Sequence, residues 1–223
     1  MRDALTRSRV RGAVGRSLAA AAAAAALGLS TAAEAALTVH TSASSFAAAV
    51  GNLQADTFAS LPIDFQRSPI ERSTASYGYA VAAPGGLYGT GPATDPWLST
   101  NRFGAVLTFS DFSGGVTAIG GQFFGSTLAG VPDPGQRVRF MAVDSLGASS
   151  VYALDDAARS SFVGFVSTGT MVSLTADIGT RDSFVTVDNL ALAQAIPEPQ
   201  TYALLLAGLG ALGLGARRRQ RDF

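Results

Sequence analysis

The side chains best able to do chemistry in this sequence are few and poorly grouped for catalysis. Asp155 and Asp156 form a carboxylate pair, the residue type that hydrolyses glycosides. Neighbouring residues on a strand point to opposite faces, whereas that reaction needs two carboxyls facing each other ~5–9 Å apart. His40 is the sole histidine and cysteine is absent, so neither a triad nor a thiol nucleophile is expected. We therefore predict no catalytic residues and no enzyme activity.

Four aromatic side chains with a polar edge gather in residues 77–99, a stretch rich in Gly and Pro. They are Tyr77, Tyr79, Tyr88 and the single tryptophan, Trp97. The composition predicts a long loop or a pair of irregular edge strands. Such rings can stack on the C–H face of a sugar while Asp95 accepts its hydroxyls. Equally, the same rings can cover one end of a hydrophobic core.

Apolar and polar residues alternate through much of residues 36–195, with the period of two that is typical of half-buried strands. The strands expected from this pattern cover residues 37–41, 107–110, 116–124, 137–142, 150–154, 162–167, 172–178 and 183–192. Segments rich in Gly, Pro, Asp and Ser separate many of them. One short helix is expected over residues 44–50, capped by a serine. The fold class is therefore all-β, a β-sandwich or jelly roll.

The charge of this region excludes one class of partner. Residues 36–196 hold seven arginines against twelve acidic residues, and the chain contains no lysine. Nucleic-acid binding needs clustered basic side chains, so no nucleic-acid partner is expected. Without cysteine, the domain depends on its core or on a metal for stability.

The first 35 residues have the organisation of a secretory signal peptide. Five arginines precede an alanine-rich apolar stretch, residues 18–29, and an A-x-A cleavage site follows at Ala33 and Ala35. No consecutive arginine pair precedes the apolar stretch, which favours the general secretion machinery over the twin-arginine route. We expect the exported domain to begin at Ala36.

The C-terminal segment, residues 196–223, has the organisation of a membrane tail. Pro197, Glu198 and Pro199 precede an apolar segment, residues 202–216, and then a basic stop. The stop consists of Arg217, Arg218 and Arg219. Positive flanks stay on the cytoplasmic side, so the domain before Pro197 is expected across the inner membrane. The apolar segment is shorter than the ~20 residues of a stable span, which predicts a transient transmembrane helix.

These three parts, in this order at the C-terminus, resemble the PEP-CTERM sorting signal of Gram-negative, exopolysaccharide-producing bacteria. Ile196 stands where that family usually has valine. The resemblance implies an exosortase as partner, a membrane protease-transpeptidase that recognises the triplet and cuts near it. It also implies release to the cell surface or extracellular matrix.

The body, residues 36–195, is similar to jelly-roll domains common in proteins with this tail, chiefly through residues 162–167, 171–178 and 184–190. In related carbohydrate-binding jelly rolls, an aspartate on the last strand ligates a structural calcium. Asp188 matches that position, so the resemblance implies calcium as the one candidate cofactor. Asp188 and Asn189 can instead end strand pairing or make a turn.

Two functions follow as expectations. The domain is either a structural or interaction protein of the cell surface or biofilm matrix, or a carbohydrate-binding module that retains exopolysaccharide through residues 77–97.

Overall fold

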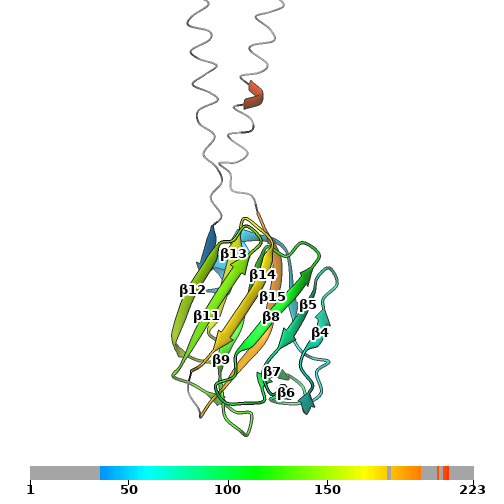
Figure 1. The fold of residues 1–223 in the computed structure, drawn as a ribbon, viewed down its shortest axis with the longest axis vertical. Helices are drawn as coiled ribbons and strands as arrows, with labels where there is room; N and C mark the ends of the chain where they lie inside the picture. The colour runs from blue at the N-terminus through cyan, green and yellow to red at the C-terminus, as the bar shows by residue number, and fades with distance from the viewer. Residues whose placement is uncertain (1–35, 180–181, 197–204, 206–207, 211–223) are drawn as a thin grey trace, which may run out of the picture. The chain divides into compact units, whose positions relative to one another are not determined.

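A computed structural model describes residues 36–179, 182–196, 205 and 208–210 of the chain. Its body is an antiparallel β-sandwich in which two sheets pack face to face around one main core (Figure 1). The expected all-β, jelly-roll-like sandwich is confirmed.

One sheet has nine strands within the described residues and runs in the order β1-β13-β9-β15-β7-β6-β3, with β10 beside β9 and β2 beside β15. The strands are β1 (Leu37–His40), β2 (Val50–Asp56), β3 (Phe65–Gln66), β6 (Leu87–Thr90), β7 (Trp97–Thr100), β9 (Ala118–Ser126), β10 (Pro132–Asp133), β13 (Phe162–Ser167) and β15 (Phe184–Ala195). The long strand β15 pairs with β9 along one side, and with β7 and then β2 along the other. It therefore connects the two ends of the sheet.

The other sheet has six described strands in the order β12-β11-β14-β8-β5-β4. They are β4 (Ile70–Ser73), β5 (Gly78–Ala82), β8 (Leu107–Ser113), β11 (Gln136–Asp144), β12 (Ser149–Ala157) and β14 (Met171–Asp177). Its outer face carries the exposed ion pairs Arg137–Asp155 and Arg139–Asp177.

A chain of aromatic rings runs through the core and joins the two sheets. Phe123 lies at its centre, 4.9 Å between ring centroids from Phe140 and 6.3 Å from Phe109. Tyr79 and Phe165 extend the chain at its two ends. Tyr79, Phe109 and Phe140 come from the six-stranded sheet, and Phe123 and Phe165 come from the nine-stranded sheet. Because all five side chains are almost fully buried, their contacts help to fix how the sheets pack.

The expected helix is present as α2 (Ala43–Ala49). The Ser42 side chain caps it by accepting a hydrogen bond from the Ser45 N–H at 3.2 Å, and Phe46 is its buried residue. Val50, expected as the last helical residue, instead begins β2.

All eight expected strands are confirmed, with shifts of a few residues at their ends. The expectation of a long loop or irregular edge strands at residues 77–99 is wrong. That segment forms β5, β6 and β7, and both β5 and β7 have neighbours on each side. Glycine suits this segment because other parts of the chain pack directly against its backbone. A Cβ on Gly89, for example, would lie 1.9 Å from the Pro62 carbonyl oxygen.

No helix in the part of the chain that the structure describes is both long and apolar enough to cross a membrane. The predicted cleavage residues Ala33 and Ala35, the Pro197–Pro199 triplet and the stop formed by Arg217, Arg218 and Arg219 lie outside the described residues. The predicted transmembrane segment lies mostly outside them.

Candidate functional site

A cavity of about 610 Å³ lies against the outer face of the nine-stranded sheet. Tyr88 and Thr90 of β6 and Trp97 and Ser99 of β7 line it, together with residues 126–132, which comprise the end of β9, the loop at residues 127–131 and the start of β10. In this sheet Leu87 and Leu98 point into the core, so the alternating residues Tyr88 and Ser99 face outward. The cavity exists because the loop covers that outer face.

Three buried hydroxyls hydrogen-bond to one another beneath the loop. The Ser126 and Thr186 hydroxyl oxygens are 2.7 Å apart, and the Thr186 hydroxyl donates to Ser99 at 3.0 Å. Ser99 and Ser126 also line the cavity. Each hydroxyl has one donor and two acceptor positions, so these mutual hydrogen bonds do not fill every acceptor position of the cluster.

Apolar side chains form the rim of the cavity. Leu128 is 84% exposed, and Ile63 and Val131 are also exposed. Phe184 lines the cavity and stacks on Phe103, with 4.1 Å between ring centroids. A hydroxyl-bearing interior with an apolar rim is typical of sites for small organic molecules.

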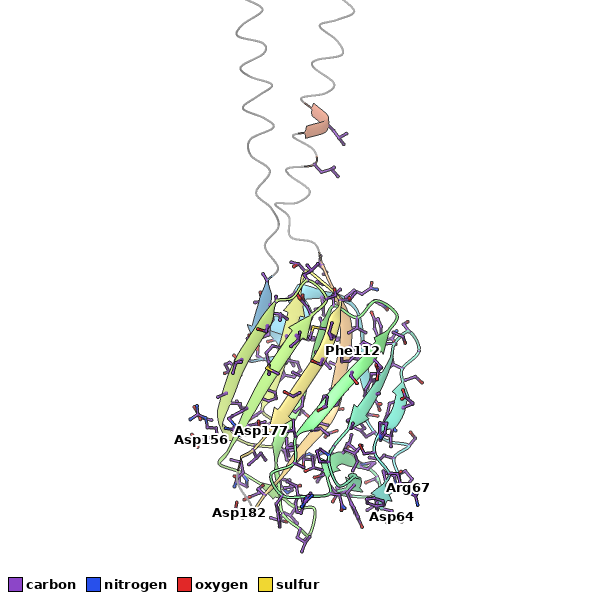
Figure 2. The ribbon with its side chains drawn as sticks, in the orientation of Figure 1. Asp64, Arg67, Phe112, Asp156, Asp177 and Asp182 are labelled. Atoms are coloured by element: carbon purple, nitrogen blue, oxygen red, sulfur yellow. The ribbon has the colours of Figure 1, made fainter. Side chains whose placement is uncertain are left out.

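No ionisable carboxylate, imidazole or guanidinium group lines this cavity within the described residues. Figure 2 places Asp64, Arg67 and Asp182 at the same end of the sandwich, and none of the three belongs to the lining. The described lining of the cavity is therefore uncharged, although charged side chains lie at that end.

Trp97 is only 3% exposed because other groups cover its ring. Gly91, with φ +93°, packs so closely that a Cβ there would lie 2.7 Å from the ring. The Arg159 guanidinium carbon lies 4.5 Å from the ring centroid. The ring is therefore not free to stack on a sugar, although its buried N–H has no hydrogen-bond partner in the described structure.

Asp188 lies in an ion-pair cluster with Arg159 and Asp95. The Arg159 guanidinium donates to Asp188 at 3.3 Å and also to Asp95. Burial raises the pKa of Asp188, although Arg159 acts in the opposite direction. One Asp188 carboxylate oxygen is buried without a partner in the described structure.

These residues do not fit the calcium site implied for Asp188. Calcium takes six to eight oxygen ligands, whereas here the guanidinium of Arg159 supplies the positive charge. The described residues contain no group of three or more acidic, His or Cys side chains suited to a metal. The alternative that Asp188 and Asn189 end the pairing is also wrong: β15 continues to Ala195, with a register shift between Asp188 and Ala191 and φ of +50° at Asn189.

Tyr77 and Tyr79 lie in the main core, where they cannot serve as a glycan surface. The Tyr77 hydroxyl donates to the Asn52 carbonyl at 3.0 Å, and the Tyr79 hydroxyl donates to Asp56 at 2.8 Å. Burial raises the pKa of Tyr79, so its hydroxyl stays protonated as a donor. Of the four predicted aromatic residues, only Tyr88 is partly exposed at the cavity.

The carboxylates considered for hydrolysis do not face each other across a cleft. Asp155 pairs with Arg137 at 3.2 Å on the exposed face of the six-stranded sheet, and Asp156 is exposed with φ +53°. His40 lies in β1, with its ring 6.1 Å from that of Phe46.

Sequence reasoning missed two hydroxyl-bearing residues that line the cavity, Ser99 and Ser126, and Thr186, which hydrogen-bonds to both. All three alternate with core residues and resemble ordinary solvent-facing positions. Only the fold shows that residues 127–131 lie beside them, and no local pattern in the sequence indicates this.

Comparison with known proteins identifies the C-terminal segment. Residues 195–219 match the model of the PEP-CTERM protein-sorting motif, which confirms the predicted sorting tail. No curated protein matches the chain. Among solved structures, the chain is similar to a family 11 carbohydrate-binding module from Clostridium thermocellum, in complex with a beta-1,3-1,4-mixed-linked tetrasaccharide. The match has 13% identity and a TM-score of 0.29, and covers 61% of this chain and all of the module.

Proposed function

From the PEP-CTERM motif at residues 195–219, we propose that this chain is an exported protein of the cell surface or exopolysaccharide matrix, sorted and processed by an exosortase. The β-sandwich serves there as a structural and interaction module rather than as an enzyme. The sorting motif carries this proposal.

The proposal predicts the two ends of the exported protein. Intact-mass analysis of the surface form is expected to give an N-terminus at Ala36 and a C-terminus close to the Pro197–Pro199 triplet. The same mass reveals any attached lipid or glycan. Recovery of the full-length chain from the cytosol, with both ends intact, would contradict the proposal.

The cavity favours a second candidate function, the retention of matrix polysaccharide. Its support is the position of Tyr88, a partly exposed aromatic side chain on the wall of a neutral cavity that also contains hydroxyls. Such a ring can cover the apolar face of a sugar while hydroxyls bond to its edge.

The retention of the exported protein on purified exopolysaccharide tests this second function. We expect Tyr88→Ala to weaken retention about tenfold, because removing one interface aromatic side chain commonly costs more than about 1.4 kcal/mol. Tyr152→Ala is the matched control, since Tyr152 is also partly buried but lies on β12 in the other sheet. Equal retention of the two variants would exclude a role for the cavity wall.

A further inference from the structure

We propose that the cavity between β6, β7 and residues 126–132 binds one uncharged sugar ring of a glycan. This inference rests on the second candidate function and names its ligand class. The volume of about 610 Å³ falls within the range of roughly 300–1,000 Å³ that small-molecule sites occupy.

The charge of the surroundings selects a neutral ligand. Among the residues that the structure describes, the lining contains no side-chain cation to pair with a carboxylate and no carboxylate to pair with an amine. Near the cavity, Arg159 pairs with both Asp95 and Asp188. An ionised sugar would have to bury its charge without a partner, which is unfavourable. The excess of acidic residues in the body further disfavours uronic acids.

The distribution of polar groups selects a ring that bears hydroxyls. Thr90, Ser99, Ser126 and Thr127 bring hydroxyls to the lining, and Asn101 brings an amide. Hydroxyls and amides can both donate and accept, as the edge of a sugar requires. A fatty acyl chain could make no hydrogen bond to the Thr127 hydroxyl or the Asn101 amide, so a lipid is the less suitable occupant.

The covering loop has a defined shape before any ligand binds. The Thr127 N–H donates to the Val131 carbonyl at 2.9 Å, and the Val131 N–H donates to the Thr127 hydroxyl at 3.3 Å. Gly130 packs on β6, where a Cβ would lie 1.8 Å from the Thr90 hydroxyl oxygen. A preformed wall reduces the cost of ordering on binding.

Titration of the ¹⁵N-labelled exported protein, followed by NMR, tests the ligand class. The probes are cellobiose, maltose and lactose as neutral disaccharides, digalacturonate as an acidic one, and decanoate as an acyl chain. We expect at least one neutral disaccharide to shift the amide signals of Gly91, Ser99 and Gly130. Digalacturonate is expected to bind at least tenfold more weakly. The proposal is overturned if no neutral disaccharide shifts these signals, or if decanoate shifts them at lower concentration.

Thr90→Val tests whether a lining hydroxyl contributes, because valine keeps the shape and removes the oxygen. We expect a Kd about tenfold higher for the neutral disaccharide. Thr108→Val, on β8 in the other sheet, is the matched control and should leave the Kd unchanged. Leu128→Ser changes an exposed rim residue with little risk to folding, and should weaken binding several-fold. Unchanged binding by both cavity variants would overturn the proposal.

The same variants distinguish sugar binding in this cavity from the broader proposal that the protein retains matrix polysaccharide. If exopolysaccharide retains the wild type and Thr90→Val equally well, glycan binding stands and the cavity is not its site. If neither is retained, matrix retention itself fails.

Discussion

Replacing Glu198 with alanine is expected to leave export intact but to stop removal of the C-terminal segment. Pro197 and Pro199 lack backbone N–H groups and have a fixed φ, so we expect an extended triplet. The carboxylate of Glu198 is too costly to bury in lipid, so we expect the triplet at the membrane surface, within reach of a protease. We expect unprocessed protein to accumulate in the inner membrane, and processed protein to fall at least tenfold by intact mass.

Two further variants show what the protease recognises. Glu198→Gln keeps the side-chain shape without the charge. If the protease recognises the charge, this variant should keep its C-terminal segment, as expected for Glu198→Ala. Gln200→Ala lies outside the triplet and should be processed like the wild type. Normal removal of the segment from Glu198→Ala would refute the role of the triplet.

The second large effect is expected at Asp56, which joins β2 to the other sheet. Its carboxylate accepts two hydrogen bonds from Arg72, both at 2.7 Å, and one from the Tyr79 hydroxyl at 2.8 Å. Asp56→Asn would leave the nearly buried guanidinium of Arg72 without its counter-charge. We expect a loss of about 3 kcal/mol in the free energy of unfolding, measured by denaturant titration of the exported protein.

Two other variants and the pH dependence of stability serve as controls for the expected effect of Asp56→Asn. Tyr79→Phe removes one hydrogen bond and should cost about 1 kcal/mol, whereas Glu71→Gln, at an exposed position on β4, should change stability by less than about 0.5 kcal/mol. Although burial opposes it, hydrogen bonding from Arg72 lowers the pKa of Asp56 below its usual value. Its contribution is therefore present above about pH 4 and is lost as the pH falls further. Asp56→Asn should weaken that acid dependence; an unchanged acid profile would contradict the assignment.

The strands of the fold could be predicted because their pattern is local. Val138, Phe140 and Ala142 alternate with outward residues, and the core contains all three. Residues 77–99 gave no such pattern, since Gly and Pro occur there both in turns and in closely packed strands. Gly89 is required by contact with Pro62, which is distant in sequence from β6. Close contacts of this kind cannot be predicted from local composition.

The candidate site was predicted only in part, for the same reason. Tyr88 and Trp97 do line a cavity, but Tyr77 and Tyr79 belong to the core. The alternation along a strand shows which residues share a face. It does not show which face lies on the core until the strand is assigned to a sheet. Arg159, which covers Trp97, lies far from it in the sequence, so its role depends entirely on tertiary structure.

The ends of the described chain and the cavity lie at opposite ends of the β-sandwich. Strand β1 begins and β15 ends at the same end of the sandwich (Figure 1). There, Thr117 hydrogen-bonds both to Ser167, beside the start of β1, and to Ala193, near the end of β15. Phe184, at the opposite end of β15, lines the cavity about 36 Å away along the strand. Cleavage at both termini, as proposed above, would therefore act at one end of the β-sandwich. A protein attached through that end would present the proposed sugar-binding cavity away from the point of attachment.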